Sequence, residues 1–266
     1  MEDKNRTRTG AHPGQGDAGG ACVPPMRQVV DWFREAALEV LSPTRCASCE
    51  RPGALVCDRC LAQMQLIDPA RACVRCGAPF GSMLCTECDG EPASLDRCLA
   101  AAVFDGPPSR IVRAYKDAGE RRLAEVIARM LLDTALHAQE ADPERYGGIL
   151  DAADAVTFVP ATAHAFRRRG FDHMDAIARA FFLLSGAPLV DALVKRGRSD
   201  QRALGRGGRR ASASGAYGVV APVESMRLLL LDDVVTTGAT IQAAAAALKA
   251  SGAAHVDALA LARVWG

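Results

Sequence analysis

The sequence predicts an α/β fold, a mainly parallel sheet with flanking helices, that follows a small cysteine-rich module. Three observations predict this fold class. Four Cys-x-x-Cys pairs lie between Cys46 and Cys88 and mark the module. From residue 98 onward, apolar runs of strand length alternate with stretches of helical periodicity, which is typical of parallel α/β sheets. One run, 228–231, is apolar at every position, as expected of a strand that is covered on both faces.

Composition limits the classes of function. The 32 basic and 31 acidic residues nearly cancel, so no global field favours nucleic acid or a membrane surface. No apolar run reaches the length of about 20 residues that a membrane span needs. Residues 1–25 are rich in glycine, proline and polar residues and lack the apolar region of a signal peptide. We therefore expect a disordered tail at 1–25 and a cytoplasmic protein.

The elements follow from periodicity, in chain order. Residues 26–42 have apolar positions at helical spacing and predict an amphipathic helix, which Ser42-Pro43 ends. Residues 43–97 contain few large apolar side chains and need a staple to fold. Residues 98–266 form the α/β domain. Its predicted strands are 99–104, 154–159, 189–194, 227–231 and 256–264; its predicted helices are 109–118, 121–139, 172–184 and 240–251; a basic, glycine-rich loop is predicted at 195–215.

The cysteine pairs predict two metal sites, and residues 43–97 are interpreted as a double zinc ribbon. A Cys-x-x-Cys turn aims two thiolates at one point, and a second turn completes a closed tetrahedral site that suits a structural zinc. Interleaved pairing, an iron–sulfur cluster and thiols without metal stay open as alternatives. Cys98 has no partner at ligand spacing and is expected to be a small buried residue. The predicted ligands are Cys46, Cys49, Cys57 and Cys60 for the first site and Cys73, Cys76, Cys85 and Cys88 for the second.

The segment 228–240 predicts a binding site for a sugar phosphate. An apolar strand delivers Asp232 and Asp233 at its carboxyl end, where parallel sheets bind their ligands. The residues after them, 236–240, are small and hydroxylated and lead into a helix, whose backbone N–H groups and dipole attract phosphate. Carboxylates repel phosphate but accept hydrogen bonds from hydroxyl groups. A ligand with both groups, a sugar phosphate, satisfies both parts of the segment.

This segment closely resembles the 5-phosphoribosyl 1-pyrophosphate (PRPP) signature of type I phosphoribosyltransferases. The resemblance implies the type I phosphoribosyltransferase-like fold for residues 98–266 and Mg²⁺ as the companion of PRPP. It implies that Asp232 and Asp233 act at the ribose hydroxyls. It also implies that the 5-phosphate is bound by the loop of Thr236, Thr237, Gly238, Ala239 and Thr240.

The order of the segments is similar to that of the ComF family, in which a cysteine ribbon precedes a phosphoribosyltransferase-like domain. The match extends from about Cys46 to Arg263, with Asp172 and His173 in place of the usual Asn-Gln of that family. His164 and His173 are both expected to be surface histidines. The resemblance implies further PRPP-binding residues, among which Arg169 would contact the pyrophosphate. These residues are Lys116, Val159, Pro160, Arg169, Gly170 and Gln201.

Three hypotheses for the function follow from these features. The first is an enzyme, a glycosyltransferase that moves the phosphoribosyl group of PRPP to an unknown acceptor. The second is a competence protein for DNA uptake, as the ComF resemblance implies, with single-stranded DNA and a helicase as partners. Aromatic residues for base stacking near the basic segments are Phe166, Phe171 and Tyr217. The third is a regulator that senses PRPP without turnover.

Overall fold

The computed structural model describes residues 43–79, 83–196 and 215–265. From Thr44 onward these residues belong to one compact unit. The predictions for the tail at 1–25, for the helix at 26–42 and for Gln201 in the basic loop lie outside the described residues. Within the ranges that are described, no helix is long and apolar enough to cross a membrane.

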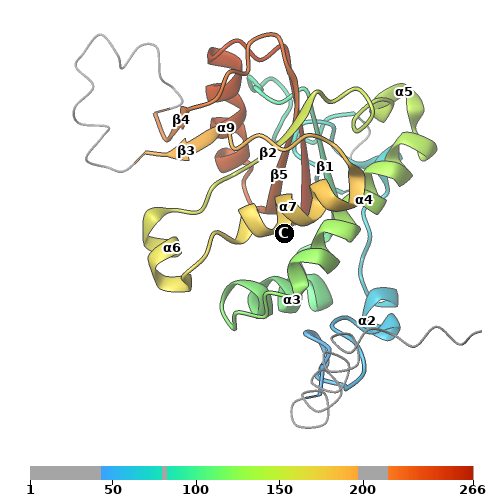
Figure 1. Cartoon of the computed structure of the whole chain (residues 1–266). Coiled ribbons are helices and arrows are strands. Elements are labelled where there is room, and N and C mark those ends of the chain that lie inside the picture. Colours follow the sequence, from blue (N-terminus) through green and yellow to red (C-terminus); the bar gives the residue numbers. More distant parts are fainter. Residues whose placement is uncertain (1–42, 80–82, 197–214, 266) are drawn as a thin grey trace, which may run out of the picture. The chain divides into compact units, whose positions relative to one another are not determined.

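A four-stranded sheet in the order β1-β6-β5-β2 forms the centre of this unit (Figure 1). Every neighbouring pair in it is parallel, so the carboxyl ends of its strands meet at one edge. The predicted fold class, a mainly parallel sheet with flanking helices, is therefore confirmed. The strands are β1 (Arg97–Val103), β2 (Ala155–Phe158), β5 (Arg227–Val235) and β6 (His255–Arg263).

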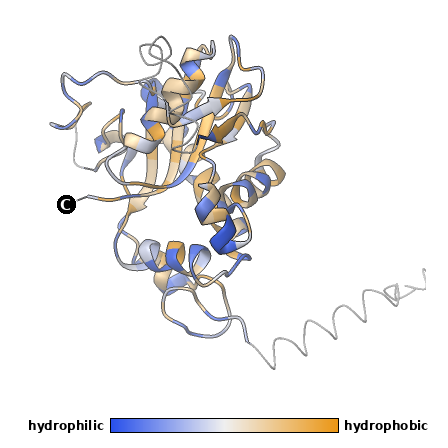
Figure 2. Cartoon of the chain, turned by 90° about the vertical axis from the view of Figure 1, so that its left-hand side faces the viewer, coloured by the Kyte–Doolittle hydropathy of each residue, from blue (hydrophilic) through white to orange (hydrophobic). Residues whose placement is uncertain are grey.

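The helices cover both faces of the sheet, because alternate residues of each strand point to opposite sides. Leu229 and Leu231 of β5 belong to the core beneath α4 (Leu123–Ala141) and α7 (His173–Ser185). Leu228 and Leu230 belong to the core beneath α9 (Ala239–Ala250). A strand that fills two cores must be apolar at every position, and Figure 2 shows the strands hydrophobic along most of their length. The other elements are α2 (Asp58–Ala62), η1 (Pro69–Arg71), α3 (Gly106–Lys116), α5 (Pro143–Tyr146), α6 (Ala163–Arg169), α9 (Ala239–Ala250) and an antiparallel pair, β3 (Leu193–Lys195) and β4 (Tyr217–Val219).

Several elements differ from the prediction, and three of the differences go beyond small shifts of a boundary. β5 does not end at residue 231 but continues through both aspartates, because Asp232 and Val234 still pair with β6. Residues 163–169, for which the sequence predicts no helix, form α6, since the Thr162 hydroxyl accepts a hydrogen bond from the backbone N–H of Ala165 at 3.0 Å. The strand predicted at 189–194 is a single bridge at Leu189 followed by β3.

Candidate functional site

The eight predicted ligands form two separate clusters. In each cluster, the four ligand sulfurs lie within 4.8 Å of one another. The Sγ atoms of Cys49 and Cys57 are 3.6 Å apart, and those of Cys76 and Cys85 are 3.7 Å apart. Four sulfurs bound tetrahedrally to zinc at about 2.3 Å would be separated by about 3.8 Å, so both clusters fit a structural zinc. The members are Cys46, Cys49, Cys57 and Cys60 in the first cluster and Cys73, Cys76, Cys85 and Cys88 in the second.

The pairing is sequential, and the interleaved alternative is wrong. Each knuckle closes on itself through backbone hydrogen bonds, from Glu50 N–H to the Cys46 carbonyl and from Gly77 N–H to the Cys73 carbonyl, both at 2.8 Å. A hydrogen bond with Cys76 and backbone N–H groups lower the pKa of Cys73 to about 4 despite its burial, which favours the thiolate form that binds a metal. Cys98 is fully buried, which confirms the prediction of a small buried residue, and burial raises its pKa to about 12.

The two aspartates of β5 lie at the carboxyl end of the sheet in different surroundings. Asp233 is 3% exposed, and its Oδ2 contacts the Nζ of Lys116 from α3 and the Nε2 of His173 from α7, the latter at 3.2 Å. Asp232 is 7% exposed and accepts a hydrogen bond from the backbone N–H of Asp233 at 2.9 Å. No cation within the described part of the chain forms an ion pair with Asp232.

These surroundings shift the two pKa values in opposite directions. Burial alone would raise the pKa of Asp233, but the hydrogen bond from His173 and the charge of Lys116 outweigh it and hold that pKa well below its usual range. Burial raises the pKa of Asp232 well above its usual range, and the negative charge of Asp233 raises it further. The charge of the Asp233 carboxylate is thus balanced by the side chains that contact it, whereas Asp232 lacks a positive partner among the described residues.

His173 joins Asp233 to Arg169, which is a connection that the sequence did not predict. The guanidinium of Arg169 lies 3.3 Å from His173 Nδ1. A guanidinium can only donate, so Nδ1 is the acceptor in this contact, and Nε2 faces the Asp233 carboxylate at 3.2 Å. The backbone carbonyl of His173 accepts a hydrogen bond from the Tyr115 hydroxyl at 2.6 Å. The expectation of a surface histidine is wrong for His173, which is 7% exposed, because α3 and the end of β5 enclose it.

His164 is exposed, as expected. It lies on α6, whose residues are all at least partly accessible, and no charged partner is close to it among the described residues.

Asp172 ties the residues after β2 to α7. Its Oδ1 caps the helix by accepting hydrogen bonds from the N–H groups of Met174 at 2.9 Å and Asp175 at 3.3 Å. Its Oδ2 accepts from the N–H of Ala161 at 2.9 Å. An asparagine offers one acceptor oxygen where the aspartate offers two. The aspartate at this position is therefore explained by its two roles, as the cap of α7 and as the acceptor for the Ala161 N–H.

The hydroxylated loop lies between β5 and α9 and is open to ligands. Thr236, Thr237, Ala239 and Thr240 are exposed, and Gly238 turns the chain into the helix with a φ of 80°, which a glycine adopts without strain. No side chain caps α9. Apart from a long hydrogen bond of 3.4 Å from the Ala239 N–H to the Thr237 hydroxyl, no side chain occupies the N–H groups of its first turn, and the dipole of the helix favours negative charge there.

Most of the remaining predicted site residues gather near these aspartates. Val159 and Pro160 follow β2 beside Asp232, because Val159 N–H donates to the carbonyl of Leu231 at 3.0 Å. A cavity of about 360 Å³ is lined by Lys116 together with Arg168 and Arg169. Gly170 ends α6 in the left-handed conformation. It has no side chain and takes no part in the ion pairs around the aspartates.

Comparisons with known proteins agree with this architecture. The chain is 28% identical over 229 residues to DNA utilization protein YhgH of Salmonella typhi, a match that covers 83% of this chain and 97% of the relative. The same protein of Escherichia coli strain K12 is also 28% identical with the same coverage. Competence protein F of Haemophilus influenzae is 23% identical over 203 residues, which cover 73% of this chain and 82% of the relative. The chain is a homologue of these proteins. The resemblance to the ComF family is thereby confirmed.

The chain was also compared with protein-family models and with solved structures. No protein-family model matches the chain. A solved structure of the allosteric regulatory enzyme of purine biosynthesis is 23% identical to it and covers 53% of this chain but only 25% of its own length, with a TM-score of 0.33.

Two residues of the candidate site, His173 and Arg263, are not predicted from the sequence. His173 was discounted because a single histidine after an arginine-rich stretch carries no periodic or spacing signal. Arg263 was not considered at all, although it is only 3% exposed at the end of β6 and donates to the carbonyl of Thr236. An arginine at the end of an otherwise apolar strand is the signal that could have found it.

Proposed function

We propose that this chain binds PRPP together with Mg²⁺ at the carboxyl end of β5. The observation that carries the proposal is the pair of buried aspartates, 232 and 233, directly before an exposed threonine loop and an uncapped helix. A buried carboxylate without a positive partner is costly, and a polyhydroxyl ligand with its cation would relieve that cost at Asp232. The adjoining loop would hold the phosphate of the same ligand, as in a pentose phosphate.

The surrounding cations define where the pyrophosphate group would lie. Lys116 and Arg169 reach the site from α3 and α6, on the side where the 360 Å³ cavity opens. The Nε atom of Arg169 is buried and has no hydrogen-bond partner within the described part of the chain, so a phosphate oxygen there would satisfy it. Bound Mg²⁺ would neutralise charge on the pyrophosphate.

The same arrangement supports transfer of the phosphoribosyl group. The bond between the anomeric carbon and the pyrophosphate oxygen would break, a nucleophilic acceptor would bond to that carbon, and Arg169 with Lys116 would stabilise the departing pyrophosphate. The aspartates would orient the ribose through its hydroxyls. Binding without pyrophosphate release from any acceptor would instead identify a sensor of PRPP.

The proposal is tested by titration calorimetry of the full chain with PRPP and Mg²⁺, followed by a pyrophosphate-release assay. We expect Gly238→Ala to weaken PRPP binding about tenfold, which corresponds to about 1.4 kcal/mol, because the strain shifts the loop. The matched control is Gly186→Ala, since Gly186 has a φ of 72° against 80° for Gly238 and neither would meet a neighbour within 4 Å. Both variants should lose similar stability. Failure of the unmodified chain to bind PRPP would overturn the proposal.

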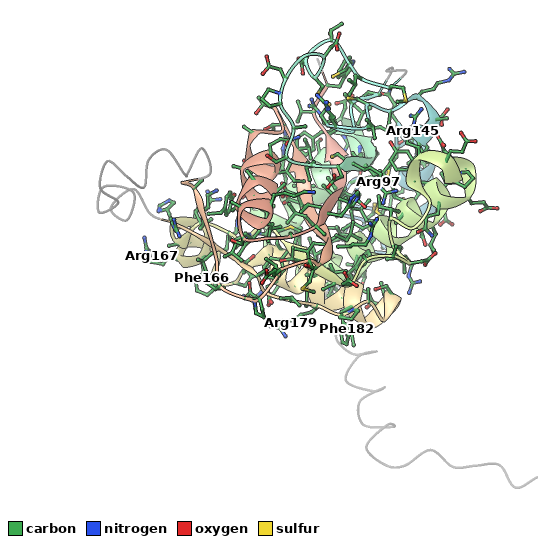
Figure 3. The ribbon with its side chains drawn as sticks, turned by 90° about the horizontal axis from the view of Figure 1, so that it is seen from above. Arg97, Arg145, Phe166, Arg167, Arg179 and Phe182 are labelled. Atoms are coloured by element: carbon green, nitrogen blue, oxygen red, sulfur yellow. The ribbon has the colours of Figure 1, made fainter. Side chains whose placement is uncertain are left out.

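A second candidate function, binding of single-stranded DNA, is favoured by one surface. Phe166, 50% exposed, and Arg167 project from α6 at the edge of the molecule (Figure 3). Both line a groove of about 810 Å³, which also contains Phe171 and Lys195. Aromatic rings beside cations grip single strands by stacking and phosphate contacts. The printed names of the relatives, a DNA utilization protein and a competence protein, agree with such a role.

For this surface we expect salt-sensitive binding of a fluorescent oligothymidine that weakens about tenfold or more in the double variant Phe166→Ala/Arg167→Ala, because stacking contributes about 1–3 kcal/mol per base. The matched control is Phe182→Ala/Arg129→Ala, which removes an exposed aromatic and an exposed arginine from α7 and α4, outside the groove. Equal affinity of all three proteins, measured by fluorescence anisotropy, would exclude this surface.

A further inference from the structure

The second cysteine cluster is joined to the threonine loop by one buried arginine. Arg263 ends β6 and is 3% exposed. Its Nε donates to the backbone carbonyl of Cys76 at 3.1 Å, and one terminal nitrogen lies 3.8 Å from the Cys76 sulfur. The other terminal nitrogen donates to the carbonyls of Thr236 and Val264. A single rigid guanidinium therefore contacts a predicted metal ligand and the first residue of the loop at the same time.

A second connection runs through Gln242 in the first turn of α9. Its side-chain oxygen accepts hydrogen bonds from the N–H groups of Ser94 at 2.9 Å and Leu95 at 3.2 Å, and its nitrogen donates to the carbonyl of Arg75 at 3.3 Å. Arg75 lies between Cys73 and Cys76, and its guanidinium donates to the carbonyl of Cys88 at 3.0 Å. The second knuckle and the start of α9 together line a cleft of about 200 Å³.

The first cluster has no comparable connection. Its residues contact α3, where the Nε of Arg110 donates to the Ser48 hydroxyl at 3.0 Å, and the core beneath α4. Among the residues that the structure describes, no hydrogen bond or ion pair joins the first cluster to the loop or to α9. The two clusters differ in this respect, although their ligand sets are identical.

We propose that metal binding at the second cluster is coupled to sugar-phosphate binding at the threonine loop, and that Arg263 is the positioning residue that couples them. This rests on the proposed function. With the metal in place, the carbonyl of Cys76 is fixed, and Arg263 in turn fixes the carbonyl of Thr236. Without it, the four sulfurs of the knuckle are no longer held together, and the contacts that Arg263 and Gln242 make with the knuckle no longer fix the loop and the start of α9. Because coupling between two binding sites is reciprocal, a bound sugar phosphate must also retain the metal.

The first arm of the test needs no ligand. Cys88→Ser and Cys49→Ser each remove one accessible ligand, from the second and the first cluster respectively. Metal content and hydrogen–deuterium exchange of the peptide that contains residues 236–242 are measured for both. We expect about fivefold or faster exchange of that peptide in Cys88→Ser only. Unchanged exchange after loss of the second metal, or equal acceleration in both variants, would overturn the proposal.

The second arm tests Arg263 itself. In the unmodified protein, ribose 5-phosphate is expected to slow the chelator-induced release of one of the two zinc ions several-fold. In Arg263→Lys that retention should vanish, since an ammonium cannot bridge both carbonyls. The control is Arg97→Lys: Arg97 is a partly buried arginine that forms a bidentate contact with Asp257 and lies at the amino ends of the strands, far from the threonine loop (Figure 3 labels it). Retention in Arg263→Lys equal to that in Arg97→Lys would exclude the arginine as the link.

The two arms separate this inference from the proposed function. If the unmodified chain binds no PRPP, the proposed function fails, while the exchange of residues 236–242 still decides whether the second cluster holds the loop. If PRPP binds and exchange is unaffected by the second metal, the proposed function stands and the coupling is wrong.

Discussion

Chelation of the bound metal is expected to unfold the cysteine-rich residues 44–96. The core of the second knuckle consists of little more than its own cysteines and Ala78, so its apolar burial is far too small to fold it. Structural zinc contributes roughly 10–16 kcal/mol to the folding of such modules, which is comparable to the whole stability of a typical domain. The metal-free chain should therefore lose this module as a cooperative unit.

The loss should spread to the sheet. Residues 65–67 pair with β1 through hydrogen bonds from Ile67 N–H to the Ala101 carbonyl at 3.0 Å and from Val103 N–H to the Gln65 carbonyl at 2.9 Å. Unfolding of the module would expose this strand edge, which favours aggregation. We expect zinc analysis to give two ions per chain before chelation, and limited proteolysis to cut first within 44–96 afterwards. Cys98→Ala is the control, because Cys98 is buried but belongs to neither cluster. A chelated protein with an unchanged cleavage pattern and melting temperature would contradict the zinc assignment.

The second large effect is that Asp233→Asn and Asp232→Asn change the free energy of unfolding in opposite directions: the first should lower it and the second should raise it. Replacement of Asp233 leaves Lys116 and His173 without the carboxylate that both contact, and the uncompensated buried charge should cost roughly 3 kcal/mol in the free energy of unfolding. Replacement of Asp232 removes a charge that burial and Asp233 disfavour, so this variant should be more stable than the unmodified protein at neutral pH. Both variants should lose PRPP binding.

The pH dependence gives the sign of each contribution. The pKa of Asp233 is lowered in the folded protein, so its stabilisation is present above the ordinary aspartate pKa of about 4 and is lost as the pH falls below that value. The pKa of Asp232 is raised, so the folded state binds the extra proton, and stability declines as the pH rises from about 4 toward the raised pKa. Urea unfolding of the three proteins between about pH 2 and 8 measures both trends. Equal destabilisation by the two substitutions would show that the environments of the aspartates are not different in the way described.

These two predictions also show why the aspartate pair could be found from sequence while its internal asymmetry could not. Adjacent acids after an apolar strand and before a threonine-rich turn are a local pattern, and a local pattern can be recognised without knowledge of the fold. Which acid is neutralised depends on α3 and α7, whose Lys116 and His173 lie far from residue 233 along the chain. Side chains that approach from distant segments leave no trace in the spacing around the motif.

The sequence by itself determined the α/β class and the order of the main strands and helices along the chain. It also determined the two sets of four cysteines and the loop that follows the aspartates. Each of these rests on periodicity or short-range spacing. Only the tertiary structure decided that β5 runs through the aspartates, since that depends on continued pairing with β6. It also decided that His173 is buried and that Arg263 joins the second cluster to the loop. The physical reason is common to all three: burial and hydrogen bonding at the end of a parallel sheet are set by which segments the fold brings together.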